Sequence, residues 1–542
     1  MKNYTLRKGI FVPMLIIFTF VIIFGFINPS QFYQIEVAIS NFGYDYFGWL
    51  YILITLSSIG VLAWVFFSKK GDIIMGGKDA KPFYDSYWKW FAVALISIIG
   101  TGMVIWGIAE PVTFFHDPVT GIGGFGGTLE PMSQGAAVYG LGTALLHWGI
   151  PSIALYTILT IGIGFACYNM KLPYRISSMM YVIFGKRVQG VLGTVIDVFC
   201  FFAIAVSVAA VLAVASTTIA AGISIFFGIE TGAAARGIIL LVILTTFIIS
   251  SYTGLKKGIR FLSDLNAKIF VGLMIYVFIF GNPRFIMSLS TEAIGVTLDS
   301  FFTRMTYLGT VSGDKFPMWW TVIYWIWMIV YGPMMGLFLA KIAQGRTFRQ
   351  VIGVTMLPAF FIMGWFLIFG SSAINMEMTR NAPIYTTMSE RGLEAAVFAF
   401  FNQLPLGLIL GIGFIFVLFL SVVTMCDSLA TTCASLSVNS ATGAIAEPPG
   451  YLKIFWSVVM ASVAFLAVVA NTVSADGIDM LHAAKMLPMT GALPMLLVYT
   501  FGIWAIVKMF RNTDKYDVAN NPETAIVPQD VMVRQQEAPV KE

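Results

Sequence analysis

The sequence predicts an all-α polytopic membrane protein with twelve transmembrane helices, and three observations support this class. First, 58% of the 542 residues are apolar and only 11% are charged, against roughly 25% charged residues in soluble domains. Second, apolar stretches recur at close to the ~20 residues that one membrane-spanning helix needs. Third, lysines and arginines gather in alternate loops between these stretches. The composition therefore excludes a soluble enzyme and a disordered chain, and nothing in it indicates nucleic-acid binding.

The twelve expected spans are apolar runs separated by polar breaks. In chain order they cover residues 10–28, 47–68, 87–115, 135–168, 190–228, 235–252, 264–283, 317–342, 350–371, 404–438, 452–471 and 485–510. The fifth and tenth runs are longer than one perpendicular helix requires, so we expect them to tilt or to extend beyond the bilayer. Between the spans, residues 288–305 and 385–402 are expected to form amphipathic surface helices.

The basic residues predict the orientation of the spans. Clusters of Lys and Arg follow the second, fourth, sixth, eighth and twelfth spans, whereas the loops after the first and third spans contain neither. Because short basic loops stay on the cytoplasmic side, we expect the even-numbered loops and both termini to be cytoplasmic. The chain is accordingly expected in the cell (inner) membrane as a multi-pass protein.

Two spans contain helix-interrupting residues near their middles. The third carries Gly100-Thr101-Gly102 and the eighth carries Gly332-Pro333. Glycine weakens a helix, and proline removes a backbone hydrogen bond. Either feature alone also permits close helix packing or a simple kink. Because each break opens a block of five spans, the pair favours an inverted-repeat transporter with a central site.

This pattern divides the chain into four segments. Residues 1–85 form the N-terminus with two peripheral helices, 86–286 the first repeat, 287–511 a surface helix and the second repeat, and 512–542 the tail. The tail is polar, mixed in charge and contains three prolines. Such a composition buries too little apolar surface to fold, so the tail is expected to be disordered.

Aromatic residues gather in the eighth span and recur in the fourth. Trp320, Trp327 and Tyr331 are spaced by seven and four residues, so they share one helix face. Trp148 and Tyr156 are eight residues apart in the fourth span and share a face too. An interfacial aromatic belt is the alternative interpretation, but Trp327 lies near mid-span. Tryptophan faces turned toward a cavity would bind a quaternary ammonium group by cation–π attraction.

No metal site, cofactor or covalent chemistry is expected. The four cysteines lie in apolar stretches without CxxC spacing, and the three histidines show no HExxH pattern, so neither zinc nor disulfides are expected. A membrane-embedded enzyme is disfavoured because no cluster of histidines and carboxylates is visible in the sequence. A channel is disfavoured because no filter-like segment repeats.

Several motifs give the chain a resemblance to the betaine/choline/carnitine transporter (BCCT) family over about residues 8–510. The most specific is the eighth-span run Trp320-Thr321-Val322-Ile323-Tyr324-Trp325-Ile326-Trp327. Further matching motifs are Trp106-Gly107…Glu110-Pro111, His147-Trp148-Gly149, Lys257-Gly258-Ile259-Arg260, Phe338-Leu339-Ala340-Lys341 and Asp427-Ser428. The resemblance implies twelve helices, a LeuT-like five-plus-five inverted-repeat core and usually a homotrimer.

The resemblance also implies a substrate site. In the family, two tryptophans and a tyrosine of the fourth span and one tryptophan of the eighth enclose the substrate, and Trp148, Tyr156 and Trp327 match them. The residues expected to bind substrate are Gly100, Thr101, Gly102, Met103, Thr113, Trp148, Ile153, Tyr156, Trp320, Trp327, Met328, Tyr331 and Met335.

Three positions depart from the family's pattern. Ile153 and Met328 stand where the family has tryptophan, and Thr113 stands where the carnitine exchanger has tyrosine. Each missing cation–π contact weakens ammonium binding by about 0.5–2 kcal/mol. The substrate is therefore expected to be a weaker or smaller cation, or a zwitterion such as taurine whose ammonium is not the group that contributes most to binding.

Coupling residues are also implied by the resemblance. Sodium-coupled members carry a Thr-Ser pair in the tenth span, whereas this chain has Thr424-Met425, and a thioether is a poor ligand for a hard cation. Arg260 and Met335 match residues of the sodium-independent carnitine/γ-butyrobetaine exchanger, in which the arginine fills the sodium site. Alternatively, Arg260 is one more basic loop residue. Asp427 lies beside Thr424 and either takes part in coupling or braces helix packing.

These observations favour a secondary transporter that moves a small zwitterionic or quaternary-ammonium solute, such as betaine or carnitine, by alternating access. Sodium-independent exchange or uniport is the expected mode. A sodium-coupled importer of glycine betaine or choline, and a transporter of a taurine-like zwitterion, are the alternatives. The expected partners are this solute, the lipid bilayer and two further copies of the chain.

Overall fold

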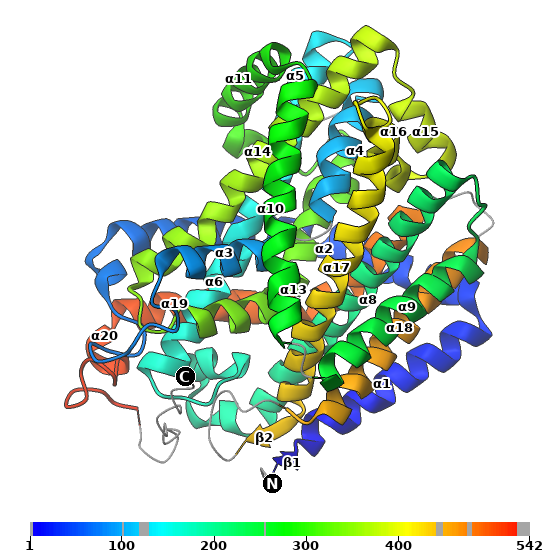
Figure 1. Cartoon of the computed structure of the whole chain (residues 1–542). Helices are drawn as coiled ribbons and strands as arrows, with labels where there is room; N and C mark the ends of the chain where they lie inside the picture. Colours follow the sequence, from blue (N-terminus) through cyan, green and yellow to red (C-terminus); the bar gives the residue numbers. More distant parts are fainter. Residues whose placement is uncertain are drawn as a thin grey trace.

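The computed structural model describes residues 4–99, 102–118, 129–253, 256–440, 448–473 and 480–527 and is built from helices (Figure 1). The helices are α1 (Lys8–Ile27), α2 (Pro29–Phe67), α3 (Tyr87–Ile98), α4 (Gly102–His116), α5 (Gln134–Trp148), α6 (Ile150–Gly164), α7 (Tyr181–Phe184), α8 (Val191–Phe227), α9 (Ala233–Thr253), α10 (Lys256–Phe280), α11 (Pro283–Asp299), α12 (Phe301–Met305), α13 (Ile323–Ile342), α14 (Phe348–Arg380), α15 (Ile384–Arg391), α16 (Ala396–Phe401), α17 (Gly407–Leu436), α18 (Gly450–Val473), α19 (Met480–Arg511) and α20 (Thr513–Tyr516). An antiparallel ribbon pairs β1 (Tyr4–Leu6) with β2 (Val438–Ser440). The all-α class is confirmed.

Each expected span coincides with a helix or a pair of helices. Among the described residues, eight helices are long and apolar enough to cross a membrane, or up to ten if each of two bent pairs forms one span. Ala233–Ile249 and Gly407–Val423 are shorter apolar stretches, below the ~20 residues of a full span. The multi-pass character therefore stands, and the count of twelve stays a prediction.

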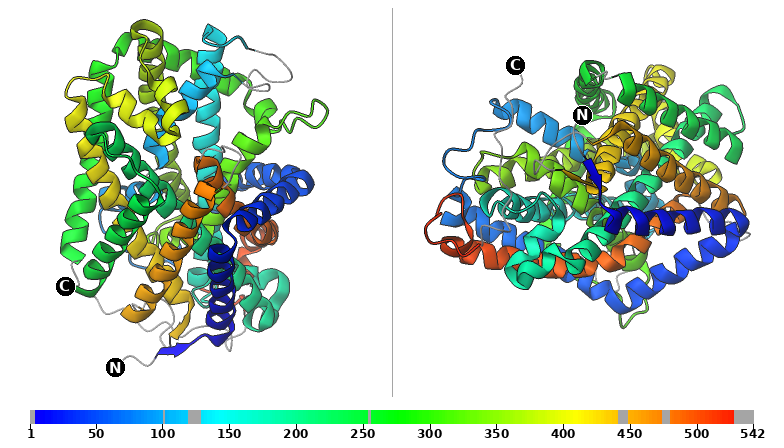
Figure 2. Two further views of the ribbon diagram at one scale, coloured as in Figure 1. Left: turned by 90° about the vertical axis from the view of Figure 1, so that its right-hand side faces the viewer. Right: turned by 90° about the horizontal axis from the view of Figure 1, so that it is seen from below.

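The first two helices lie at the periphery of the helix array in both views of Figure 2. Only 22% of the apolar stretch in α1 is buried inside the protein, against 94% for residues 134–169. Side chains such as Ile16 and Phe20 on α1 are exposed, which suits contact with lipid rather than water. The core is instead formed by α4, α5, α6, α8, α13, α14 and α19.

The two expected helix breaks have different outcomes. The third span is broken, because α3 and α4 are separate helices bent by 58°; Gly100 and Thr101 lie outside the described residues. The eighth span is not broken at Gly332-Pro333, because α13 continues through both residues. Its irregular part lies earlier, in the π-helical turn η5 (Pro317–Val322). The expectation of two matching mid-span breaks is therefore wrong for the second.

Close packing explains the glycine in the eighth span. A Cβ atom on Gly332 would lie 1.8 Å from the hydroxyl oxygen of Tyr499 on α19, and one on Gly336 would lie 2.9 Å from the Cβ of Leu159 on α6. Small residues four apart let membrane helices approach each other closely. Gly332 thus serves helix contact, the alternative that its sequence pattern left open.

Substituting Gly332 by alanine is expected to destabilise the protein by about 1–3 kcal/mol, as overpacking of a full core does. The added methyl group displaces the Tyr499 hydroxyl, which donates to the carbonyl oxygen of Leu155 at 2.9 Å. Thermal unfolding of the purified protein measures the loss. Gly413→Ala in α17 is the control, because a Cβ there meets no atom within 4 Å; an equal melting temperature for the two variants would contradict the packing argument.

Several of the even-numbered loops contact one another, on the side of the molecule where α20 lies in Figure 1. The Lys70 ammonium donates to the Thr513 hydroxyl at 3.1 Å, and the Lys508 ammonium donates to the carbonyl oxygen of Val182 at 2.6 Å. The Arg349 guanidinium donates to the carbonyl oxygen of Phe66 at 2.8 Å. These contacts join the loops after the second, fourth, eighth and twelfth spans, as a common side of the membrane requires.

Part of the C-terminal segment is folded, which corrects the expected disorder of 512–542 for residues 513–527. The Asp517 carboxylate accepts hydrogen bonds from Asn169 at 3.0 Å and Asn520 at 2.8 Å, and the Ala519 amide donates to the Asn169 carbonyl. Burial raises the pKa of the Asp517 carboxyl, and these hydrogen bonds oppose the rise. Composition cannot reveal such docking, because its partner lies 348 residues away. Residues 528–542 lie outside the described residues.

The two expected surface helices also differ from each other. Residues 288–305 form α11 and α12, and α11 has the single buried face of an amphipathic helix, with Ile286, Leu289 and Ala293 inside. Residues 385–402 form α15 and α16, but α16 is entirely buried. The surface prediction is wrong for α16 because its sequence, Ala-Val-Phe-Ala-Phe-Phe, offers no polar face.

Candidate substrate site

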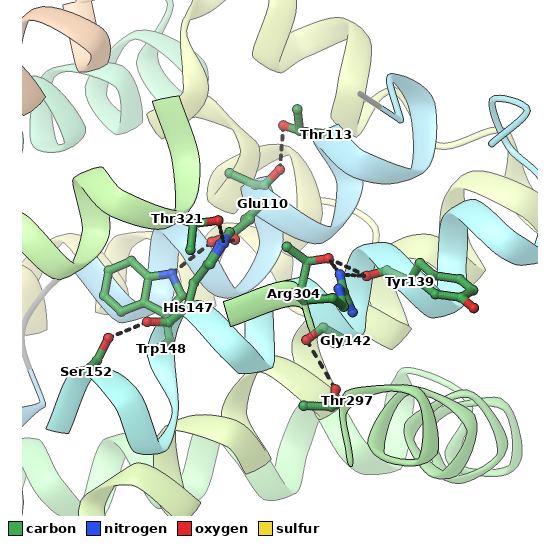
Figure 3. A network of polar contacts seen from close by, with 12 residues as sticks. Glu110, Thr113, Tyr139, Gly142, His147, Trp148, Ser152, Thr297, Arg304 and Thr321 are labelled. Atoms are coloured by element: carbon green, nitrogen blue, oxygen red, sulfur yellow. Dashed lines mark hydrogen bonds and ion pairs between the residues drawn. The ribbon is translucent and has the colours of Figure 1, made fainter. Parts of the chain in front are cut away.

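A buried hydrogen-bond network joins α4, α5 and η5 (Figure 3). The two carboxylate oxygens of Glu110 accept from His147 Nδ1 at 2.5 Å and from Trp148 Nε1 at 2.8 Å. His147 Nε2 lies 2.9 Å from the hydroxyl of Thr321. Glu110 and His147 are fully buried. One carboxylate therefore fixes the indole of a predicted substrate residue and holds three elements of the core together.

Local sequence explains why Trp148 sits at this point. The fourth span is interrupted at Gly149, which ends α5, and Pro151 lies at the start of α6. A Cβ on Gly149 would lie 2.5 Å from the Leu145 carbonyl oxygen and 2.9 Å from Met363, so the position admits only glycine. Trp148 thus projects from the last turn of α5.

The network is energetically demanding. A buried carboxylate costs several kcal/mol in lost hydration unless charges and hydrogen bonds replace the water. Here the Nδ1 of His147 and the indole N–H of Trp148 supply these interactions. Intramembrane ionisable groups are rare, and they commonly mark substrate or ion pathways. Glu110 and His147 are therefore candidates for function.

Tyr324 on α13 is the centre of the surrounding aromatic cluster. Its ring centroid lies 5.0 Å from that of Trp148, 5.3 Å from Trp106, 5.2 Å from His147 and 6.3 Å from Trp327. These separations are those of favourable edge-to-face and offset aromatic pairs. The cluster connects the fourth-span and eighth-span tryptophans through one shared ring.

The structure brings the three matched cage residues into one region. Trp148 and Trp327 both contact Tyr324. Tyr156 on α6 donates its hydroxyl hydrogen to the sulfur of Met328 at 2.7 Å. Trp148, Tyr156 and Met328 are each less than 9% exposed. Whether they hold substrate stays a prediction.

The other predicted substrate residues lie at differing distances from this cluster. Gly102 is close to it, because a Cβ there would lie 3.9 Å from Trp148, and Met103 follows it inside the core. Trp320 contacts Trp106 at 6.3 Å and Tyr324 at the same centroid distance. Gly102 therefore lies against Trp148, and Trp320 lies against two rings, those of Trp106 and Tyr324, that contact Trp148.

Three further residues continue the buried face of α13 and α6. Met335 and Ile153 are buried, and the Tyr331 hydroxyl donates to the Ser207 carbonyl on α8 at 3.2 Å. Thr113 points elsewhere: its hydroxyl donates to the Ala109 carbonyl at 2.7 Å and lies 3.8 Å from the sulfur of Met388. Because Met388 belongs to α15, Thr113 lies on the side of α4 that packs against α15.

The predicted coupling residues fall mostly outside what the structure describes. The side chains of Arg260, Thr424 and Asp427 are not among the described side chains, although their backbones belong to α10 and α17. Met425 is half-buried and packs against the core. The replacement of sodium by Arg260 accordingly stays a prediction.

The sequence interpretation missed the Glu110–His147 pair as a functional group. Both residues stood in matching motifs, but 37 positions separate them. A carboxylate inside the third span was the available signal. The statement that no histidine–carboxylate cluster exists is corrected by this pair, although the described residues contain no group of three or more potential metal ligands.

Another carboxylate inside an apolar helix, Asp197 on α8, has a different environment. Its Oδ2 accepts from the Arg7 guanidinium at 2.8 Å and its Oδ1 accepts from the Ser177 amide at 3.1 Å. Arg7 and Ser177 therefore lie near the first turns of α8. This end of α8 is next to the ribbon of β1 and β2, because Arg7 directly follows β1. Asp197 therefore fastens the N-terminus and lies apart from the aromatic cluster.

A polytopic helical fold with a buried polar and aromatic centre, formed where a broken span meets its neighbours, is typical of an integral membrane transporter. The betaine/carnitine/choline family transporter model (BCCT) matches residues 9–515. The chain belongs to this family and is a transporter, not an enzyme.

Three relatives illustrate the degree of sequence similarity, and each is less than 30% identical to this chain. The chain is 28% identical to a probable glycine betaine transporter of Desulfitobacterium hafniense, covering 86% of this chain and 90% of the relative. It is 28% identical to an osmo-independent choline transporter of Acinetobacter baylyi, covering 89% and 94%, and 27% identical to an ectoine/hydroxyectoine transporter of Virgibacillus pantothenticus, covering 95% and 99%. A solved sodium-coupled sialic acid symporter superposes with a TM-score of 0.46 at 12% identity, covering 87% and 86%.

Proposed function

We propose that this protein is a secondary transporter of a small betaine-like solute, either quaternary ammonium or zwitterionic. The observation that carries the proposal is the fixed indole of Trp148, which lies between Tyr324 and the start of α4. The relatives' substrates, glycine betaine, choline and ectoine, support the same chemical class. A thermal-shift screen of the purified protein against betaine, carnitine, choline and taurine tests the proposal; absence of any stabilising solute would contradict it.

The proposed binding mode divides the solute between two groups of residues. Trp148, Tyr156 and Trp327 face the ammonium, since aromatic faces attract a cation with about 0.5–2 kcal/mol each. Backbone groups around Gly102 at the start of α4 receive the acid end, because helix N-termini favour anions. Ile153 and Met328 reduce the number of aromatic faces, which keeps a taurine-like zwitterion as the alternative substrate.

Transport is proposed to proceed by alternating access within an inverted five-plus-five repeat, in which the third, fourth, eighth and ninth spans move against the rest. A homotrimer in the cell membrane with cytoplasmic termini is part of the same proposal. The contacts among the basic loops support this orientation. In this arrangement the Glu110 network lies wholly inside the moving unit, because it joins α4, α5 and η5.

The coupling mode is proposed to be sodium-independent exchange or uniport. Met425 supports it, because a thioether is a poor sodium ligand, and Arg260 would supply a fixed positive charge in place of the ion. Sodium-coupled import is the alternative.

The two coupling modes differ in their response to the cation. In proteoliposomes, exchange of labelled solute is expected to be equal, within about twofold, in sodium and potassium buffers, because no step binds sodium. Replacing Arg260 by glutamate is expected to make exchange depend on sodium or abolish it, since the fixed positive charge that Arg260 would supply is removed. Arg284→Glu, at an exposed position on α11, is the control. Strict sodium dependence of the unaltered protein would contradict this mode.

A further inference from the structure

A cavity of about 380 Å³ lies away from the candidate substrate site, where α8 ends, α9 begins and α15 leads into the turn Leu393–Ala395. This volume falls within the range of small-molecule sites. Its charged lining consists of Arg236, Arg391, Glu230 and Glu394. Two positive and two negative side chains around one cavity match a ligand that carries one charge of each sign.

The four charged side chains differ in how far they are buried. Glu394 is only 2% exposed and interacts electrostatically with Arg236 in the first turn of α9. Arg391 and Glu230 are exposed. An arginine at a helix N-terminus opposes the helix dipole, so Arg236 does not stabilise α9 by its position. Arg236 instead lines the cavity, and among the lining residues Glu394 is the opposite charge that influences it.

The cavity has room for a polar group beside these charges. A Cβ atom on Gly232 would meet no atom within 4 Å. The hydroxyls of Thr217 and Thr231 line the cavity and donate to carbonyl oxygens of α8 at 2.9 and 3.2 Å. Each hydroxyl oxygen keeps acceptor capacity for an ammonium group.

Apolar side chains on α8, on α9 and on the connection between them are exposed near the residues that line the cavity. Phe227, Ile229 and Ile238 are 57%, 56% and 62% exposed. In a polytopic membrane protein such side chains contact lipid tails. A charged hollow beside an apolar surface suits a phospholipid, whose headgroup charges adjoin its acyl chains.

We propose that this cavity binds a zwitterion whose anionic group contacts Arg236 and Arg391 and whose ammonium contacts Glu230 and Glu394. The phosphoethanolamine headgroup of a phospholipid, with its acyl chains along α9, is the source that the adjoining apolar surface favours. A free zwitterionic solute shares this chemistry and is distinguished below.

Occupancy of the cavity bears on the transport core through α15. Arg391 at the end of α15 lines the cavity, while Tyr385 in its first turn stacks on His116 of α4 with centroids 4.3 Å apart. Glu377 of α14 binds both partners, accepting from the Tyr385 amide at 2.7 Å and lying 2.9 Å from His116 Nε2. A bound headgroup that holds Arg391 therefore also holds the outer end of α4.

Native mass spectrometry of the detergent-purified full chain tests the proposal with dioleoyl phosphatidylethanolamine and dioleoyl phosphatidylglycerol. The unaltered protein is expected to retain phosphatidylethanolamine in preference. Arg391→Gln is expected to weaken retention by about tenfold or more, as loss of a charge-assisted hydrogen bond does. Gly232→Leu fills the hollow without changing a charge and is expected to do the same. Arg284→Gln on α11, also exposed, is the matched control.

Glu230→Gln gives the sharpest outcome, because it leaves the cavity with excess positive charge. Preference is expected to shift from phosphatidylethanolamine toward the anionic phosphatidylglycerol. If glycine betaine, and neither lipid, binds in a manner sensitive to Arg391→Gln and Gly232→Leu, the zwitterion site is supported with a free solute as its source. Equal retention of lipid by the unaltered protein and by both of these variants, with no such solute binding, would overturn the proposal.

Discussion

Replacing Glu110 by alanine is expected to reduce transport by about 100-fold or more. The substitution removes the acceptor of both His147 Nδ1 and Trp148 Nε1, and each buried donor left without an acceptor costs about 1–3 kcal/mol. The indole of Trp148 loses its fixed orientation, so the substrate site is altered as well as the fold. Uptake of labelled solute into proteoliposomes measures the effect, and melting temperature reports on folding.

The conservative variant separates positioning from folding. Glu110→Gln keeps one oxygen that can accept from the Trp148 indole, but it loses the charge that binds His147. It is therefore expected to fold and to transport slowly. Its affinity for solute should lie between that of the unaltered protein and that of Glu110→Ala. Glu292→Gln, on the exposed face of α11, should transport normally. Normal transport by Glu110→Gln would show that the negative charge of Glu110 is not needed for transport.

The sequence predicts the elements of this fold well because the bilayer imposes a strong constraint. Helix α13, for example, lies within one residue of the expected 317–342 once its π-helical turn is included, since an apolar run of this length has few alternatives. Gly332 shows where such prediction ends. A glycine inside a membrane helix marks either a break or a contact, and only the position of Tyr499 on α19 decides between them.

For the candidate site, too, the sequence predicts some features, while others depend on tertiary contacts. Trp148 and Trp327 could be singled out from motif and spacing, because large aromatic residues near mid-span are unusual. Their connection through Tyr324, and the support of Trp148 by Glu110, depend on contacts between α4, α5 and α13. Such tertiary contacts leave no periodic signal in one sequence. The sequence therefore singles out candidate residues, but it does not reveal the interactions that orient them.

Trp327→Ala is expected to weaken binding of the true substrate by about tenfold or more. Removing the ring deletes one cation–π face, worth about 2 kcal/mol when desolvated, and also the contact with Tyr324 at 6.3 Å. Trp327→Phe keeps a smaller aromatic face, so its affinity should lie between that of Trp327→Ala and that of the unaltered protein. Isothermal titration with the solute found by thermal shift measures the affinities.

Trp88→Ala on α3 is the matched control, because this indole is 73% exposed. Its affinity should equal that of the unaltered protein. The pattern across solutes also distinguishes the two substrate classes: a quaternary ammonium solute loses most with Trp327→Ala, whereas a taurine-like zwitterion held mainly by its acid end loses little. Unchanged affinity for every solute would mean that Trp148, Tyr156 and Trp327 form a packing surface rather than a cage.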